Sequence, residues 1–316
     1  MSVMEEMGAR ALSLGIPLGV QLDLTYRCNE RCIHCYLDHD DHGELTTAEI
    51  LDLLDQLAAA GTFFLNISGG EIFMRPDLFE IVEYARKLQF SVKLKTNAVM
   101  IRAGKAKRIA ALNVESVQVS LYSHDAATHD EITKLPGSFK RTMEGVRFLR
   151  DAGVKVIFAN VLMKQNADHY KQVQALADAM GIRYEVDATI TPMMDGDRSI
   201  LDLNMDAGRL AGVLQDASLL GDQAEQMRAP PSGPKPMEEA YKTIPCSAGH
   251  TACYVSPYGD VYPCVQFPYK VGNVREQRFL AIWRDSPQLH EVRAIRVSDL
   301  NGCSSCVHGS SCSRCP

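Results

Sequence analysis

Three features that are common in other classes of protein are missing from this sequence. No stretch approaches the ~20 consecutive apolar residues that a membrane-spanning helix needs, so we expect no association with a membrane. The first twenty residues carry Glu5, Glu6 and Arg10 and lack the layout of a signal peptide. Positive charge is not in excess either, because the 316 residues have a formal net charge of −6. These absences argue against a secreted protein and against a general nucleic-acid-binding protein, and they predict a cytoplasmic location.

Cysteine is absent from the long middle of the chain. Of the ten cysteines, three lie in residues 28–35 and seven in residues 246–315, with none between these groups. Cytoplasmic proteins rarely keep disulfides. Two groups of cysteines in such a protein are therefore interpreted as metal ligands.

The first group, Cys28, Cys32 and Cys35, has the spacing C-x3-C-x2-C directly after an apolar, strand-like run. Three thiolates on one short loop can hold three irons of a [4Fe–4S] cluster, which leaves the fourth iron without a protein ligand. An open iron can take part in chemistry, whereas a cluster with four protein ligands mostly transfers electrons. A zinc or disulfide loop is the alternative, but structural zinc prefers paired C-x2-C knuckles and four ligands. The missing fourth cysteine therefore predicts an enzyme.

The second group is larger and more widely spaced. Its members are Cys246, Cys253, Cys264, Cys303, Cys306, Cys312 and Cys315. Pairs with C-x2-C spacing are typical of zinc-ribbon-like modules, and iron–sulfur clusters use the same ligands. The spacing alone leaves both alternatives open.

Between the two cysteine groups, strand-like runs alternate with helical patterns. The predicted strands cover Val20–Thr25, Phe63–Ser68, Ser91–Lys95, Ser116–Leu121, Val154–Leu162 and Arg183–Ile190. The predicted helices cover residues 46–60, 76–88, 105–112, 139–152 and 168–180. Such alternation implies a parallel sheet with right-handed crossovers. Because it stops near residue 190, whereas a closed eight-stranded barrel needs about 250 residues, we predict an α/β fold with a partial (β/α)6 barrel. Chemistry is expected at the C-terminal ends of its strands.

This pattern divides the chain into three predicted parts. Residues 1–200 form the barrel. Residues 201–242 form a bridge, with apolar residues at helical spacing over 203–228 and a Pro-rich loop at 229–236. Residues 243–316 form a small cysteine-rich domain.

Polar motifs come directly after several of the predicted strands. Gly69, Gly70 and Glu71 come after the second strand, where glycine lets the backbone approach a ligand closely. The acid can accept hydrogen bonds from an ammonium group. Asn97 closes the third strand and Ser120 the fourth. Further candidates for pocket lining are Asn160, Met163 and residues 189–192.

Together these motifs resemble the radical S-adenosylmethionine (SAM) enzymes, whose loop has the pattern C-x3-C-x-aromatic-C. His34 occupies the aromatic position. The resemblance implies a partial barrel, a [4Fe–4S] cluster on Cys28, Cys32 and Cys35, and SAM bound at the open iron. It also implies contacts to SAM from the backbone of His34 to the adenine, from Gly69, Gly70 and Glu71 to the amino group, and from Asn97 and Ser120 to the ribose or carboxylate.

One segment departs from that family. Residues 123–139 resemble a common family segment that usually has Arg where Thr133 or Lys134 stands, so an arginine contact to SAM is not expected from it. The nearby histidines are expected to be solvated; they are His124, His129 and His169.

The C-terminal cysteines resemble the SPASM domain, which carries auxiliary [4Fe–4S] clusters in radical SAM enzymes that modify peptides. Residues 255–264 have the pattern of its β-hairpin, and residues 272–274 and Trp283 fit the segment that usually comes after the hairpin. The resemblance implies two auxiliary clusters, one on Cys246, Cys253, Cys264 and Cys315, and one on Cys303, Cys306 and Cys312. Two departures leave the second cluster without an assigned fourth ligand: Cys312 and Cys315 are spaced C-x2-C instead of C-x3-C, and no further cysteine comes after them.

The resemblance implies an enzyme that reductively cleaves SAM to a 5′-deoxyadenosyl radical, which removes a hydrogen atom from the substrate. The auxiliary clusters are expected to accept an electron from the substrate, so that a peptide or protein side chain is oxidatively modified, for example by a crosslink. A small molecule such as a tetrapyrrole is the alternative substrate. An electron-transfer protein with three fully ligated clusters is the alternative from another class.

Two partners are expected besides the substrate. One is an external electron donor of the flavodoxin or ferredoxin type. The other is a separate peptide-recognition protein, because only about twenty residues precede the first predicted strand. No nucleic-acid partner is expected.

Overall fold

The computed structural model describes residues 2–220 and 242–301. Four of the predicted ligands lie outside the described residues; they are Cys303, Cys306, Cys312 and Cys315. The end of the predicted helical stretch and the Pro-rich loop also lie outside them.

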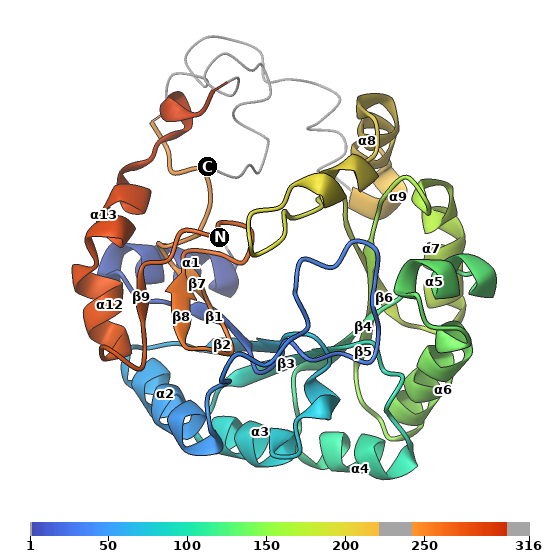
Figure 1. Ribbon diagram of the computed structural model, residues 1–316, viewed down its shortest axis with the longest axis horizontal. Helices are drawn as coiled ribbons and strands as arrows, with labels where there is room; N and C mark the ends of the chain where they lie inside the picture. The colour runs from blue at the N-terminus through green and yellow to red at the C-terminus, as the bar shows by residue number, and fades with distance from the viewer. Residues whose placement is uncertain (1, 221–241, 302–316) are drawn as a thin grey trace.

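One nine-stranded sheet forms the frame of the described structure, in the order β6-β5-β4-β3-β2-β1-β7-β8-β9. The strands are β1 (Gly19–Asp23), β2 (Phe64–Ser68), β3 (Ser91–Thr96), β4 (Ser116–Ser120), β5 (Val156–Val161), β6 (Arg183–Asp187), β7 (Ala252–Val255), β8 (Asp260–Tyr262) and β9 (Gly272–Asn273). From β1 to β6, each strand pairs in parallel with the next. Figure 1 shows that this part curves into an open barrel, which confirms the predicted partial barrel.

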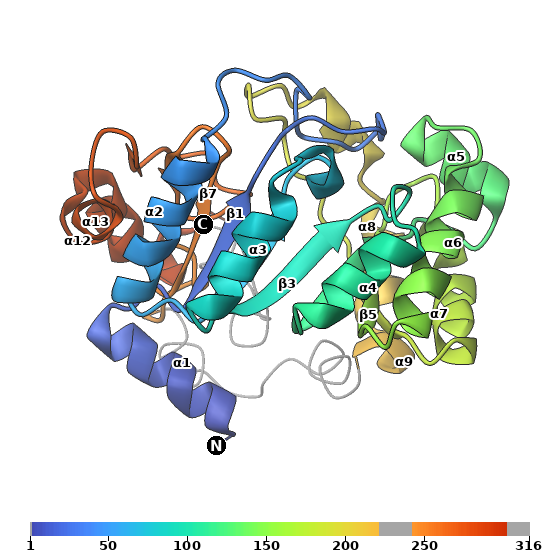
Figure 2. The same ribbon diagram turned by 90° about the horizontal axis from the view of Figure 1, so that it is seen from below.

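Helices cover the convex outer side of the barrel (Figure 1, Figure 2). Five of these helices lie between consecutive barrel strands and overlap the helices predicted from the sequence. They are α2 (Thr47–Ala59), α3 (Leu78–Lys87), α4 (Ala103–Ala111), α6 (Ser138–Asp151) and α7 (Tyr170–Ala179). Two short helices, α8 (Ala207–Leu214) and α9 (Ala217–Leu220), occupy the described part of the predicted helical bridge.

The start of α2 is explained by its sequence. The hydroxyl of Thr46 accepts a hydrogen bond from the N–H of Glu49, and the carboxylate of Glu49 accepts one from the N–H of Thr46 at 2.7 Å. This reciprocal capping satisfies N–H groups that have no partner within the helix. It fixes the point at which the chain leaves the loop that carries the first cysteine group.

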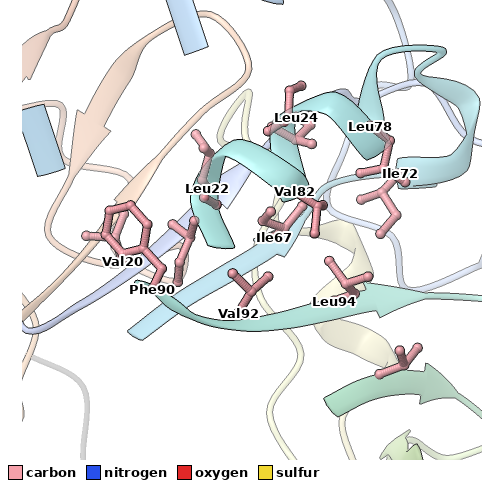
Figure 3. Packing of buried hydrophobic residues seen from close by; sticks show 14 of the residues in the cluster. Val20, Leu22, Leu24, Ile67, Ile72, Leu78, Val82, Phe90, Val92 and Leu94 are labelled. Atoms are coloured by element: carbon pink, nitrogen blue, oxygen red, sulfur yellow. The ribbon is translucent and has the colours of Figure 1, made fainter. Parts of the chain in front are cut away.

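Alternation along the strands separates an apolar outer face from a polar inner face. On β3, Val92 and Leu94 are fully buried, whereas Lys95 lines the cavity inside the barrel. Figure 3 shows Val92 and Leu94 packed with Leu22 of β1 and Ile67 of β2. Burial of each such side chain stabilises the fold by about 1.5–3 kcal/mol. The outer face therefore holds the barrel together, and the inner face is free to carry polar side chains.

The C-terminal hairpin joins the sheet of the barrel. β7 pairs in parallel with β1, with Cys253 in register with Val20. β7 and β8 pair antiparallel, so the predicted hairpin is confirmed. Its attachment to the barrel was not predicted. Beyond it, α12 (Phe279–Asp285) buries Trp283, whose Nε1 donates to the backbone carbonyl of Gly15 at 2.6 Å.

Four described helices were not predicted. They are α1 (Val3–Leu14), α5 (Ala126–Thr133), α12 and α13 (Pro287–Ala294). A capping box between Ser2 and Glu5 starts α1, and Asp125 caps α5 by accepting from the N–H of Thr128 at 2.8 Å. In the part of the chain that the structure describes, no helix combines the length and the apolarity that crossing a bilayer requires.

Candidate active site

The first cysteine group lies in the loop that comes after β1 and crosses the mouth of the barrel (Figure 1). We call residues 27–36 the cysteine loop. Cys28, Cys32 and Cys35 are free thiols, and all three line one cavity of about 470 Å³. This space, called the barrel cavity below, is bordered by the C-terminal ends of β1 to β6, where chemistry was predicted.

The three thiols lie in a setting that fits an iron–sulfur cluster. Burial raises the pKa of Cys28 to about 12 and that of Cys35 to about 11, and it raises the pKa of Cys32 well above its ordinary value. Without a metal these thiols are therefore protonated at neutral pH, and a bound metal must stabilise the thiolates. The N–H of Glu30 donates to Sγ of Cys28 at 3.4 Å. Within residues 2–220 and 242–301 no three Cys, His, Asp or Glu side chains are placed to share one metal ion. A cluster offers a separate iron to each sulfur and has no such requirement.

Gly69 and Gly70 let two loops pack backbone to backbone. The N–H of Gly70 donates to the carbonyl of Thr25 at 2.8 Å. A Cβ on Gly70 would lie 2.4 Å from the carbonyl oxygen of Arg27, and one on Gly69 would lie 2.2 Å from that of Thr25. Gly69 also has a φ of +132°, which favours glycine. The glycines thus bring the end of β2 against the start of the cysteine loop. Both glycines line the barrel cavity.

Glu71 is fully buried and does not line the barrel cavity. Its carboxylate accepts hydrogen bonds from the N–H of Phe73 at 3.0 Å, from the hydroxyl of Thr96 at 2.8 Å and from the N–H of Asn97 at 2.9 Å. Burial raises its pKa, and these donors act in the opposite direction. Glu71 therefore ties the end of β2 to the end of β3.

Asn97, Ser120 and His34 all line the barrel cavity, as their positions at strand ends and in the cysteine loop suggested. Nδ2 of Asn97 donates to Oδ1 of Asn29 at 2.8 Å, which links the end of β3 to the cysteine loop. The ring of His34 packs edge-on against Tyr122, with centroids 4.7 Å apart. Burial lowers the pKa of His34 to about 4, so its ring is neutral at pH 7.

Other residues named from the sequence divide into two groups. Asn160, Thr189 and Thr191 line the barrel cavity, whereas Met163 is fully buried and does not line it. The hydroxyl of Thr133 is buried against that of Ser138 at 2.7 Å, away from the cavity.

The prediction that His129 is solvated is wrong. Its ring is buried, stacks on Tyr122 and packs edge-on against Phe139, and its Nδ1 accepts the N–H of Tyr122 at 3.2 Å. Burial lowers the pKa of His129 to about 4. The error arose because α5 was not predicted, and this helix turns His129 inward. His124 is exposed as predicted, and His169 is half-buried with its Nδ1 2.7 Å from the hydroxyl of Ser123.

The sequence reasoning missed the polar inner wall of the cavity. Nζ of Lys95 on β3 donates to Oε1 of Gln21 on β1 at 3.1 Å. Nε2 of Gln118 on β4 donates to Glu185 on β6 at 2.7 Å, past the small side chain of Ala159 on β5. Lys95 is the only Lys or Arg among the described lining residues. The available signal was a polar residue within an otherwise apolar buried strand, as at Gln21 and Gln118.

A buried hydrogen-bonded chain connects β1, the residue before the cysteine loop and β7. The hydroxyl of Tyr254 on β7 donates to Asp23 at 3.1 Å and lies 2.6 Å from the hydroxyl of Tyr26. Burial raises the pKa of Asp23 to about 6. This chain fixes the strand that carries Cys253 beside the strand that leads into the cysteine loop.

Three cysteines of the second group lie within the described residues. Cys253 is buried on β7, and Cys246 and Cys264 are half-buried. Burial raises the pKa of Cys253 to about 12, and the proximity of Cys264 adds to this shift. The two residues directly after Cys264, Val265 and Gln266, line the barrel cavity.

Comparisons with known proteins agree with these features. A sequence family described as the radical SAM superfamily matches residues 22–177, and one described as an iron–sulfur cluster-binding domain (SPASM) matches residues 246–316. The AdoMet-dependent heme synthase of Methanosarcina barkeri (strain Fusaro / DSM 804) is 30% identical, over 95% of this chain and 91% of that protein. The mycofactocin maturase MftC of Mycobacterium ulcerans (strain Agy99) is 30% identical, over 95% of this chain and 82% of that protein. Streptococcus suis SuiB bound to the precursor peptide SuiA has the same fold, with a TM-score of 0.76 at 20% identity over 98% of this chain and 74% of that one.

Proposed function

Because the chain belongs to the radical SAM superfamily, we propose that it cleaves SAM reductively and uses the resulting radical to oxidise a side chain of a peptide or protein. When bound, a [4Fe–4S] cluster with one open iron binds SAM and supplies the electron for its cleavage. One observation carries the proposal: the cavity lined by the three cysteines of the first group is also lined by Val265 and Gln266, the two residues directly after Cys264 of the second group.

The residues around the cavity each have a proposed role. Cys28, Cys32 and Cys35 hold the cluster. The proposed contacts to SAM come from His34, Gly69, Gly70, Asn97 and Ser120, all of which line the cavity. Glu71 contributes to this site by accepting the N–H of Asn97 and so holding that residue at the end of β3. The backbone N–H of Glu71 also donates to the carbonyl of Arg27 at 2.9 Å, which helps to hold the end of β2 against the cysteine loop.

The C-terminal part is proposed to receive the electron that the substrate loses. Cys246, Cys253, Cys264 and Cys315 are the proposed ligands of one auxiliary [4Fe–4S] cluster. Cys303, Cys306 and Cys312 are the proposed ligands of another. The division into residues 1–200, 201–242 and 243–316 remains our proposal, with β7 as the strand through which the last part joins the barrel sheet.

A peptide substrate is supported by two of the similar proteins. One is a mycofactocin maturase, and another was crystallised with a precursor peptide. The inner wall of the cavity fits such a substrate, because it offers side-chain amides from Gln21 and Gln118 and charges of both signs from Lys95 and Glu185. A peptide presents N–H and C=O groups that pair with amides, and its side chains or ends carry charge.

A tetrapyrrole is the second candidate substrate. It is favoured by the 30% identity to a heme synthase over 91% of that protein. Lys95 is the one lining residue among those described that can pair with a substrate carboxylate. Both substrates use the same cysteines and the same cleavage of SAM, so they differ only in what the inner wall binds.

Further partners complete the proposal. A flavodoxin or ferredoxin is the proposed electron donor, and a separate protein is proposed to present the peptide. The proposed location is the cytoplasm, where the environment is reducing and disulfides are rare. The six cysteines within the described residues are all free thiols, which supports this location.

The test is anaerobic reconstitution, then iron counting and dithionite reduction with SAM. We expect about twelve irons per chain, the content of three [4Fe–4S] clusters, and formation of 5′-deoxyadenosine. Adding candidate precursor peptides or, separately, an iron-bearing tetrapyrrole carboxylic acid then identifies the substrate class by mass change. A fully loaded, reduced protein that yields no 5′-deoxyadenosine with either substrate would contradict the proposal and favour an electron carrier. About four irons plus zinc would retain SAM cleavage but remove the proposed electron-accepting role of the C-terminal cysteines.

A further inference from the structure

Four cations gather where the cysteine loop meets α5 and α6. They are Arg31 of the cysteine loop, Lys134 at the end of α5, and Lys140 and Arg141 in the first turn of α6. We call them the basic edge. Arg31, Lys134 and Lys140 are exposed, and Arg141 is partly exposed. Figure 1 and Figure 2 show this region on the rim of the barrel, beside the mouth that the cysteine loop crosses.

The basic edge is directly attached to the cysteine loop. The N–H of Arg31 donates to the carbonyl of Thr133 at 3.0 Å, and the N–H of Ile33 donates to that of Ile132 at 3.0 Å. The guanidinium of Arg31 donates to the carbonyl of Cys28 at 2.7 Å. Arg141 is close enough to attract the carboxylate of Glu30. Two backbone hydrogen bonds thus hold the residues on either side of Cys32 against the end of α5.

The cations of this region outnumber its acids, in contrast to the rest of the chain. Residues 102–155 contain ten Lys and Arg and six Asp and Glu, a local net charge of +4 within a chain of net charge −6. Neither Lys134 nor Lys140 is paired with an acid in the described ranges. Asp130 is occupied in starting α6, since it accepts from the N–H of Phe139 and from the hydroxyl of Ser138, each at 2.8 Å. Glu131 is the exposed acid nearest in sequence.

An electron donor must reach the cluster from outside the barrel cavity. The inner side of the cysteine loop borders that cavity, which substrate and SAM occupy in the proposed reaction. At Arg31 the outer side of the same loop is exposed and adjacent in sequence to Cys32. The basic edge therefore surrounds a short route from solvent to the first cysteine group.

We propose that the basic edge is the docking site of a small acidic electron-carrier protein, an inference that rests on the proposed function. In the complex, the carrier's reduced centre loses one electron and the cluster held by Cys28, Cys32 and Cys35 gains it. No bond is made or broken and no proton transfer is needed. Complementary charge accelerates such an encounter and makes it sensitive to salt, because the Debye length is about 8 Å at 0.15 M ionic strength.

The test compares two charge-reversal double variants of the reconstituted protein. Lys134→Glu with Lys140→Glu changes the basic edge without removing the hydrogen bonds of Arg31 and Arg141. Lys107→Glu with Arg284→Glu makes the same change in net charge at exposed positions on α4 and α12. Binding of a purified acidic flavodoxin is measured by fluorescence anisotropy at several salt concentrations. SAM cleavage is measured with flavodoxin and, separately, with dithionite.

We expect the Lys134/Lys140 variant to raise both the Kd and the KM for flavodoxin about tenfold at low salt, with a weaker salt dependence. Its dithionite-driven SAM cleavage is expected to match the wild type. The Lys107/Arg284 variant is expected to bind flavodoxin like the wild type. Equal binding by all three proteins, or equal weakening in both variants, overturns the docking site. Failure of the proposed function would be a separate result. In that case neither the wild type nor either variant yields 5′-deoxyadenosine with dithionite, and the measurement of flavodoxin binding still tests the basic edge.

Discussion

Gly70 provides the sharpest test of how the cysteine loop is held. In Gly70→Ala the added Cβ would lie 2.4 Å from the carbonyl oxygen of Arg27 and 2.6 Å from that of Tyr26. Both atoms belong to the backbone and cannot rotate away. The N–H of Gly70 is bonded to Thr25 at 2.8 Å, and the next N–H, of Glu71, is bonded to Arg27 at 2.9 Å. Relief of the clash therefore requires the start of the cysteine loop to move away from β2.

The expected cost is the balance of two opposing effects. Forcing an extra methyl group into a packed site costs about 1–3 kcal/mol, and a value near the upper limit applies because backbone carbonyls are displaced. Replacing glycine by alanine also restricts the unfolded chain, which returns about 0.4–1 kcal/mol. The net loss is about 2 kcal/mol. For a chain of this size this lowers the melting temperature by about 4 °C.

The assay combines thermal unfolding of the metal-free protein with iron counting after reconstitution. Gly70→Ala is expected to unfold about 4 °C below wild type and to lose about four irons, the content of one cluster. Gly104→Ala in α4 is the matched control, because its Cβ would meet no atom within 4 Å. It is expected to gain up to about 1 kcal/mol. If Gly70→Ala unfolds at the same temperature as the wild type and binds the same amount of iron, the close approach of Gly70 to the backbone of the cysteine loop is refuted.

Three further predictions concern single side chains. Because burial lowers the pKa of His129 from 6.5 to about 4, the unfolded state binds a proton that the folded state excludes, so stability falls as the pH drops from 6.5 towards 4. Urea unfolding is expected to show the wild type losing about 2 kcal/mol relative to His129→Asn between pH 7 and 4.5; parallel losses in both proteins contradict the buried neutral ring. Lys95→Met is expected to raise the KM of a carboxylate-bearing substrate about tenfold while substrate-free SAM cleavage stays unchanged, and an equal loss of both would instead assign Lys95 to SAM binding. Cys32→Ala is expected to abolish SAM cleavage and to remove about four irons, with the remaining iron retained by the C-terminal cysteines; wild-type cleavage in this variant would exclude Cys32 as a cluster ligand.

The features that were predicted correctly depend on residues close together in the chain. Apolar periodicity indicates the positions of strands and helices, and with them the place of Cys28, Cys32 and Cys35 in the loop directly after the first strand. Gly69, Gly70 and Glu71 come directly after β2, as predicted, and the two glycines have a purpose that was not expected. They admit the backbone of the cysteine loop, whose proximity cannot be inferred from a tripeptide.

The errors and omissions share a cause. His129 was expected in solvent because α5 was not predicted, and only a helix at that place turns its ring against Tyr122. Lys95 was passed over because alternation along one strand does not reveal which face borders a cavity. That distinction depends on how six strands curve together.

The sequence by itself determined the class of chemistry and the partial barrel, since ligand spacing, strand periodicity and strand-end motifs are local properties. The tertiary structure decided what those parts form together. It placed β7 beside β1, with Cys253 in register with Val20, and it brought Val265 and Gln266, directly after Cys264, to the cavity that the first cysteine group lines. It also brought Lys134 and Lys140 to the outer side of the cysteine loop. Pairing between segments far apart in the chain depends on the shape and the buried surface of the whole sheet, and no short stretch of sequence carries that information.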